Sequence, residues 1–267
     1  MTVRHSLCPV VERSPVHGWK PEPRNSASAK QDIGHPVMRT DELVGWQADN
    51  AEPKKRSRTF VDLESNPERA SQLCSDGQAR LLRRVAQLSN KDVRAPSLLP
   101  SWTVGHVLTH LARNADAHAR RLSGALHGTD APKYAHGQEQ RRREIEDGAV
   151  RQAEEIITDL RSSLSNLEEV FAQCAAAGWP NGHFLGGGDY GVAACPAHRL
   201  REVEMHHVDL GLGYTSLDWP DEYVAWDLPV LLATAADRLG TSRERRLFMA
   251  WLAGRGPLDL ATTLAAW

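Results

Sequence analysis

The sequence predicts a mainly α-helical protein centred on a four-helix bundle, and three observations support this. Four stretches between residues 66 and 209 place apolar residues at three- and four-residue spacing, the period of an amphipathic helix. Stretches rich in proline, glycine or polar residues separate them. Residues 216–267 hold two more apolar helices and leave little room for a sheet. We therefore expect the bundle to carry a small, mostly helical C-terminal appendage.

Residues 1–60 differ from the rest of the chain. Prolines and charges of both signs are scattered through them, and no apolar period persists. A segment that cannot bury an apolar face does not build a core. We therefore expect a disordered N-terminal extension over residues 1–60.

Start signals mark the first two helices. Asn66 can cap the first helix, and Pro67 suits its first turn, where a proline costs no hydrogen bond. Ser101 is the predicted cap of the second helix, which should run to about Leu122. The apolar positions are Leu73, Leu81, Leu82, Val85 and Leu88 in the first helix and Val104, Val107, Leu108 and Leu111 in the second.

The third and fourth helices complete the predicted bundle. The third has the clearest period, over residues 150–171. Pro196 opens the fourth. Two further apolar helices, around residues 228–239 and 245–252, form the predicted appendage, and Gly254 ends the second of them.

Two passages are predicted as loops. Residues around 128–137 read as a polar loop, and the glycine-rich residues 178–191 as a loop or a short hairpin. The second passage has neither the lysine nor the strand–helix context of a phosphate-binding loop, so we do not expect it to bind phosphate.

The composition is ordinary, with 41% hydrophobic and 25% charged residues and a formal net charge of −2. This charge favours neither nucleic acid nor an anionic membrane as a partner. No apolar run is long enough to span a membrane, and the N-terminus lacks a secretory signal. Four cysteines lie far apart without a C-x-x-C pair, which is typical of a reducing compartment. We therefore expect a cytoplasmic protein.

The most informative stretch is residues 199–209, because an α-helix returns positions four and seven apart to nearly the same face. Four polar residues share that face: Arg199, Glu202, His206 and Asp209. Val203 and Leu210 lie beside it, which predicts that it points inward. A glutamate and a histidine four residues apart can bind one metal ion, although such pairs are more often salt links or satisfied polar contacts.

A third ligand has to come from elsewhere, and the second predicted helix carries His106, His110 and His118. Since its sequence neighbours are apolar, His110 is expected to face the core. The alternative is a hydrogen-bonded core histidine without a metal. His106 and His110 form an H-x-x-x-H pair, so either could be the ligand.

Three motifs identify a family. They are S-L-L-P-S-W-T-V-G-H-V-L-T-H-L-A-R-N-A-D (97–116), Q-R-R-R-E-I-E-D-G-A (140–149), and R-L-R-E-V-E-M-H-H-V-D-L-G-L-G-Y (199–214) followed by D-W-P. The first and third resemble the two signatures of the mycothiol-dependent maleylpyruvate isomerase family, and the second resembles the helix start between them. The resemblance covers about residues 65–255.

The resemblance implies a DinB-like metal-binding bundle over residues 61–215 and a short C-terminal domain over residues 216–267. It also implies a divalent metal, most often zinc, with three protein ligands: His110, Glu202 and His206. The open fourth position would receive the sulfur of mycothiol, a small intracellular thiol. Asp209 is expected to accept the other ring N–H of a ligand histidine, with Arg199 also close to the ligands.

The family's reaction is the isomerisation of maleylpyruvate. Thiolate addition turns its cis double bond into a single bond, rotation follows, and elimination gives the trans product, fumarylpyruvate. Arg255 matches an arginine near the family's C-terminal end that would bind the anionic substrate; the alternative is an arginine that only stabilises a helix end. Arg113 and Arg141 are weaker candidates for binding substrate or thiol, each with a solvated surface position as the alternative.

One departure leaves the substrate open. Longer family members carry a strand-containing segment between the last two helices, where this chain has only L-G-T-S-R-E-R (239–245). The alternatives are a mycothiol S-transferase that conjugates electrophiles and a non-catalytic module that binds metal or thiol. Nickel, cobalt or iron would also suit two histidines and a glutamate, and the sequence leaves the oligomeric state open.

Overall fold

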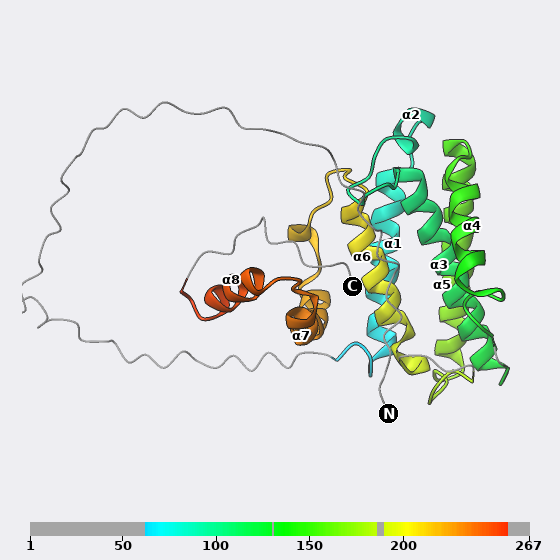
Figure 1. The fold of residues 1–267 in the computed structure, drawn as a ribbon. Coiled ribbons are helices and arrows are strands. Elements are labelled where there is room, and N and C mark those ends of the chain that lie inside the picture. The colour runs from blue at the N-terminus through cyan, green and yellow to red at the C-terminus, as the bar shows by residue number, and fades with distance from the viewer. Residues whose placement is uncertain (1–61, 130, 186–189, 256–267) are drawn as a thin grey trace, which may run out of the picture. The chain divides into compact units, whose positions relative to one another are not determined.

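The computed structural model describes residues 62–129, 131–185 and 190–255, so the predicted extension over residues 1–60 lies outside the described residues. The described part forms eight α-helices and no β-strand, which confirms the mainly α-helical class (Figure 1). The helices are α1 (Pro67–Val85), α2 (Asn90–Val93), α3 (Val104–Leu126), α4 (Gly137–Ala149), α5 (Ala153–Ala176), α6 (Cys195–Asp209), α7 (Asp221–Arg238) and α8 (Ser242–Leu252). None of these helices could cross a membrane by length and apolar character.

Four of the helices, α1, α3, α5 and α6, form the predicted bundle. α3 packs along α5, α1 packs along α6, and α3 also contacts α6, while α4 packs against α3 (Figure 1). Fully buried leucines fill the space between them, among them Leu81, Leu108, Leu160 and Leu200. Burying one such side chain contributes about 1.5–3 kcal/mol, so the apolar faces read from the sequence are what hold the bundle together.

The first helix begins as predicted, and the second does not. The side-chain oxygen of Asn66 accepts the Arg69 N–H at 3.1 Å and caps α1. The predicted cap of the second helix, Ser101, is wrong, because its φ of 66° is left-handed and a cap requires an extended backbone. Thr103 has that extended backbone and caps α3, in a box with His106, whose Nδ1 accepts the Thr103 N–H at 3.2 Å.

The predicted third helix is α5 in the structure, and it begins at Ala153 instead of Val150. Val150 ends α4 as its C-cap and is exposed, and Gln152 then opens α5 in a capping box with Glu155. The sequence does not reveal the end of α4 at Val150, because this residue continues the apolar spacing of α5. The predicted polar loop ends where α4 begins, at Gly137; α4 buries only Ile145, Gly148 and Ala149, too few residues to give an apolar period.

The glycine-rich passage contains an isolated bridge between His183 and Gly191 and no strand among its described residues, with residues 186–189 outside the description. The first C-terminal helix, α7, begins at Asp221, earlier than the predicted residue 228, because Tyr223 and Trp226 already belong to its buried side. The second, α8, ends at Leu252, and Gly254 follows with a φ of 65°, as predicted for a helix end.

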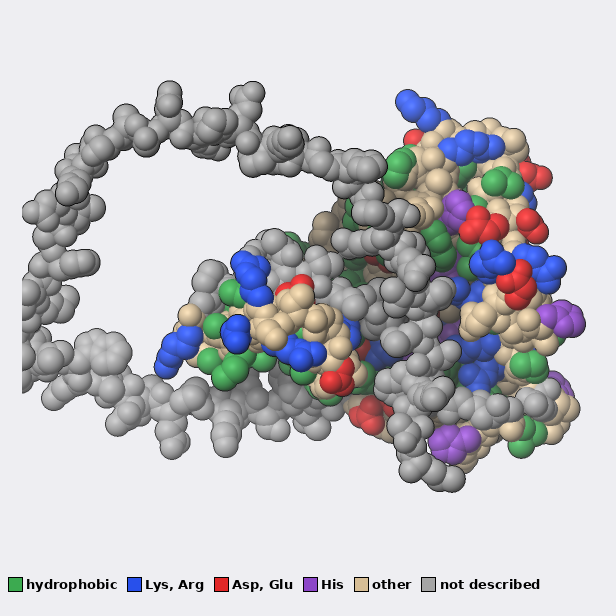
Figure 2. Space-filling view, viewed as in Figure 1, with side chains coloured by type: hydrophobic (Ala, Val, Ile, Leu, Met, Phe, Trp, Pro, Cys, Tyr) green, Lys and Arg blue, Asp and Glu red, His purple; other side chains and the backbone are tan. Residues whose placement is uncertain are grey.

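The chain divides into two compact units. Residues 59–237 form one, which contains the bundle and nearly all of α7, and α8 belongs to the other. The domain boundary between residues 215 and 216 stays a prediction. On the face of the bundle in Figure 2, basic and acidic side chains are interspersed, in keeping with the small net charge.

Candidate metal centre

Three polar side chains from two helices converge inside the bundle. The distance from His110 Nε2 to Glu202 Oε2 is 3.0 Å, and from His110 Nε2 to His206 Nε2 it is 3.1 Å. The third side of the triangle, from His206 Nε2 to Glu202 Oε2, is 3.5 Å. Among the described residues, this is the group of three whose ligand atoms could hold a metal ion.

The fold places these side chains through the contact of α3 with α6. Glu202 and His206 are four residues apart on α6, so both project from the face that the sequence predicts. His110 comes from α3 and is only 3% exposed. The segment before α3 is tied to the end of α6, because the Leu98 N–H donates to the Asp209 carbonyl at 2.8 Å. This bond fixes the start of α3 beside the histidine end of α6.

The pKa values of the three side chains shift in different directions. Burial lowers the pKa of His110 to about 4. Burial also opposes charge on Glu202, but hydrogen bonds to His110 and His206 outweigh it and hold the pKa of Glu202 well below its usual value. Burial opposes protonation of His206, yet hydrogen bonds to Asp209 and Glu202 raise its pKa to about 9. Near pH 7 the cluster therefore holds a neutral histidine, a carboxylate and an imidazolium.

The geometry fits a tetrahedral metal ion. Ligand atoms about 2.0–2.1 Å from a zinc ion at tetrahedral angles lie about 3.3 Å from one another. The three distances between the ligand atoms, 3.0, 3.1 and 3.5 Å, bracket that value. Once His206 has lost its proton, two histidine nitrogens and one carboxylate are a donor set that zinc accepts, and they leave one coordination position for another ligand.

The two residues predicted to support the ligands take different positions. Asp209 Oδ2 lies 2.8 Å from His206 Nδ1, where a carboxylate orients a ligand histidine. Arg199 is fully buried and donates to Asn114 Oδ1 on α3 at 2.7 Å and to Gln78 Oε1 on α1 at 3.4 Å. Arg199 therefore links α6 to α1 and α3, and no hydrogen bond joins it to a ligand side chain.

The three arginines predicted to bind substrate or thiol also lie in different environments. Arg141 Nη2 lies 3.2 Å from His110 Nδ1, so this arginine contacts one of the three ligand residues. Arg113 is committed to ion pairs with Asp159 and Asp116, at 2.5 and 3.1 Å. Arg255 is exposed and lies in the unit that contains α8, so its catalytic role stays a prediction.

The other histidines near the cluster have separate partners. His106 Nδ1 belongs to the α3 cap, and its Nε2 lies 3.3 Å from Glu146. His118 Nδ1 lies 3.0 Å from the buried Cys195 Sγ. The ring of His207 stacks on Tyr214 with centroids 3.8 Å apart. Of the H-x-x-x-H pair, His110 is therefore the member that meets Glu202 and His206.

Two residues at the cluster escaped the sequence reasoning. The Trp102 ring meets the His110 ring edge-on, with centroids 5.7 Å apart. Tyr134 is hydrogen-bonded to Arg141, and burial raises its pKa. Trp102 stands in the motif S-W-T and could have been singled out there. Tyr134 lies in a segment predicted as a polar loop, which carries no signal for it.

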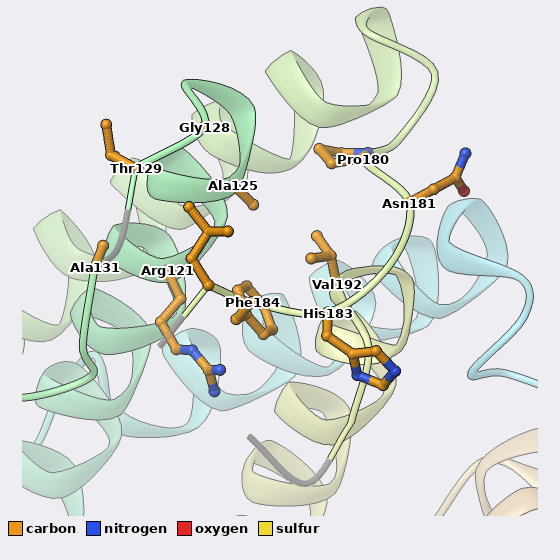
Figure 3. Close-up of a pocket in the computed structure, with 11 residues that line it drawn as sticks. Arg121, Ala125, Gly128, Thr129, Ala131, Pro180, Asn181, His183, Phe184 and Val192 are labelled. Atoms are coloured by element: carbon orange, nitrogen blue, oxygen red, sulfur yellow. The ribbon is translucent and has the colours of Figure 1, made fainter. Parts of the chain in front are cut away.

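A separate cavity of about 250 Å³ lies at the other end of α3, and none of the predicted site residues lines it (Figure 3). Arg121 stacks over the Phe184 ring there at 3.7 Å, and the remaining walls are mostly small or apolar side chains. The cavity is therefore distinct from the cluster of His110, Glu202 and His206.

Comparisons with known proteins point to one family. The family model described as "Mycothiol maleylpyruvate isomerase N-terminal domain" matches residues 74–211. A crystal structure of the mycothiol-dependent maleylpyruvate isomerase is similar, with a TM-score of 0.56 and 25% identity over 67% of this chain and 72% of the other. A histidine-to-alanine mutant of that enzyme matches with a TM-score of 0.56 and 24% identity, over 65% and 69%. No curated protein matches significantly.

Proposed function

This chain belongs to the mycothiol maleylpyruvate isomerase family, since the family's N-terminal domain model matches more than half of it, and on this premise we propose a specific activity. The protein is a metal- and mycothiol-dependent isomerase that converts maleylpyruvate to fumarylpyruvate. Its metal is a divalent ion, most often zinc in this family, held by three side chains: His110, Glu202 and His206. The observation that carries the proposal is their convergence at tetrahedral spacing.

The residues of the cluster have separate tasks in this proposal. Glu202 supplies the negative charge that offsets the cation, and Asp209 keeps the ring of His206 in the orientation that turns Nε2 toward the cluster. Trp102 covers one side of His110 and limits the access of water. When bound, the metal supplies the Lewis acidity that keeps a thiol deprotonated near neutral pH. With three side chains as ligands, the metal would have one coordination position left for the sulfur of mycothiol.

A direct assay tests the proposal. The purified, metal-loaded protein is mixed with maleylpyruvate, with and without mycothiol, and the absorbance of the enol is followed. We expect turnover with mycothiol and none without it. Consumption of an electrophile with formation of a thioether, and no action on maleylpyruvate, would favour the S-transferase. Metal binding without either reaction would leave a binding module and would contradict the proposed activity.

Arg255 is proposed as the cation that binds a substrate carboxylate, on the strength of its match to the family. Arg255→Ala should keep the metal and the fold and lose about thirty- to a thousandfold in turnover, because a charge-assisted contact made in the transition state contributes roughly 2–4 kcal/mol. Steady-state kinetics and metal analysis on the same preparation measure both. Arg255→Lys keeps the charge without the planar fork and should recover only part of the rate. Near-normal turnover by metal-loaded Arg255→Ala would remove Arg255 from the site.

A further inference from the structure

Arg141 is a partly buried cation beside the cluster that has no acidic partner. Its Nη2 lies 3.2 Å from Nδ1 of the ligand residue His110. In the part of the chain that the structure describes, no ion pair joins Arg141 to a carboxylate, whereas the two arginines that follow it on α4 both reach Glu139. Glu144, one turn further along α4, accepts from Gln140 at 2.7 Å instead. Arg141 therefore brings a positive charge without a bonded carboxylate to the edge of the metal centre.

Tyr134 adds a second donor at the same place. Its hydroxyl is hydrogen-bonded to Arg141, and because a guanidinium can only donate, the hydroxyl oxygen is the acceptor of this bond. The hydroxyl proton is then available to another acceptor. Burial raises the pKa of Tyr134, so the hydroxyl keeps this proton near pH 7. A planar cation and a hydroxyl donor side by side match the two oxygens of a carboxylate.

The proposed substrate carries two carboxylates, and the proposed role of Arg255 accounts for only one of them. One carboxylate belongs to the pyruvate half, and the other is attached to the double bond. Thiol addition conjugate to the ketone forms the C–S bond at the alkene carbon that bears this second carboxylate, and the π electrons move to the ketone oxygen. Elimination returns them and breaks the C–S bond. The carboxylate on the alkene therefore lies directly beside the reacting sulfur.

We propose that Arg141 and Tyr134 bind the substrate carboxylate that is attached to the double bond, and that they make the site selective for alkenes that bear a carboxylate. This inference rests on the proposed function and adds two residues to its substrate site. The contact of Arg141 with His110 places the guanidinium next to the ligands, where this carboxylate has to lie. A carboxylate held there keeps the attacked carbon in place while the bond beside it rotates.

Binding of maleate tests the carboxylate site without turnover. Maleate has the alkene carboxylates and lacks the pyruvate half, and no reaction occurs without a thiol. Calorimetry on the metal-loaded protein should show about ten- to a hundredfold weaker binding by Arg141→Met, because charge-assisted hydrogen bonds are lost. Tyr134→Phe loses one hydroxyl donor and should weaken binding about three- to tenfold. Arg141→Lys keeps the charge without the planar fork and should fall between Arg141→Met and the parent chain.

Arg142→Met is the matched control. Arg142 follows Arg141 on α4 and carries the same charge, but it is exposed and bonded to Glu139 at 2.8 Å. Its replacement should change the affinity for maleate less than about twofold, since an exposed ion pair contributes little. Metal content is measured for every variant, because Arg141 contacts a ligand residue. If Arg141→Met loses its metal or its fold, Tyr134→Phe and Arg141→Lys decide the question.

Steady-state kinetics separate a substrate site from a thiol site. The KM for maleylpyruvate should rise in Arg141→Met about as much as the affinity for maleate falls. The KM for mycothiol should change less than about twofold, because mycothiol has no carboxylate to lose a charge-assisted bond.

The possible results distinguish this inference from the proposed function. Unchanged maleate binding in metal-loaded Arg141→Met, or no maleate binding by the parent chain, overturns the carboxylate site and leaves the proposed isomerase activity standing. An equal rise in the KM for mycothiol would place Arg141 on the thiol and overturn the inference. A loss that Arg142→Met reproduces reflects long-range charge and overturns it as well. A parent chain that binds maleate through Arg141 without isomerising maleylpyruvate supports the carboxylate site and overturns the proposed function.

Discussion

Glu202→Ala should lose its bound metal and at least about a thousandfold of turnover. The carboxylate is the anionic member of the cluster, and without it two buried nitrogens would have to hold a divalent cation with no charge to offset it. His110→Ala and His206→Ala should have the same effect, because two remaining ligands do not hold the ion. A Lewis acid contributes several kcal/mol to the reaction, which sets the expected loss of rate. Metal analysis after dialysis and the isomerase assay measure the two losses.

Two neighbouring histidines are the controls for this experiment. His207 follows His206 directly, but its ring stacks on Tyr214 instead of reaching the cluster. His106 lies one turn before His110 and caps α3 through Thr103. Replacing either by alanine should leave the metal content unchanged, although His106→Ala should lose about 1 kcal/mol of stability with the cap. Loss of metal in His207→Ala with retention in His206→Ala would mean that the ligand assignment on α6 is wrong.

Metal affinity should also depend on pH in one direction. The raised pKa of His206, about 9, means that this ring is protonated near pH 7, and the proton on Nε2 has to leave before a metal can bind there. The apparent affinity should therefore fall about tenfold for each unit of pH below 9 and level off above it. Asp209→Asn removes the carboxylate that raises this pKa, so the pH above which the affinity levels off should be lower in this variant. A flat affinity between pH 7 and pH 9 would contradict the assignment.

The sequence predicts most of the bundle because its helices are long and amphipathic, so many residues report the same period. It also predicts the meeting of Glu202 and His206, since four-residue spacing on one helix fixes their relation before any packing is known. His110 needed the family resemblance, because helical spacing cannot say which histidine of α3 faces α6. Arg141 is the reverse case: within R-R-R it looks solvated, and only the packing of α4 against α3 brings it to His110.

The predicted cap of the second helix and the predicted start of the third were wrong, and each error has a local cause. Ser101 and Thr103 are both good capping residues, and only the backbone conformation distinguishes them. Val150 fits the apolar spacing of α5 but is exposed, because the chain turns at residues 150–152. In both cases the residue types were right for a helix end, and the position was set by the path of the chain between helices. Such paths depend on tertiary contacts, for which a single sequence carries little signal.

Asp227→Ala should lower the free energy of unfolding by about 3–5 kcal/mol. Asp227 is 2% exposed and accepts from Arg201 Nε at 2.9 Å and from the Tyr223 hydroxyl at 3.0 Å. Arg201 is buried too and stacks over Trp226 at 4.7 Å, so the pair joins α6 to α7 in the interior. Alanine would leave a buried guanidinium without its carboxylate, the costly way to break a buried pair. Chemical denaturation measures the loss.

Glu222→Ala is the matched control, because it breaks a second, more exposed ion pair between α7 and the bundle. Glu222 accepts from Arg69 Nε on α1 at 2.8 Å, but both side chains are about two-fifths exposed, at 38% and 41%. Water solvates both charges when an exposed ion pair is broken, so Glu222→Ala should lower the free energy of unfolding by less than about 1 kcal/mol. Asp227 bonds to no side chain of the cluster, so folded Asp227→Ala should still bind its metal. Equal losses of stability in the two variants would show that the Arg201–Asp227 pair is solvated, and that α7 is held by its aromatic contacts instead.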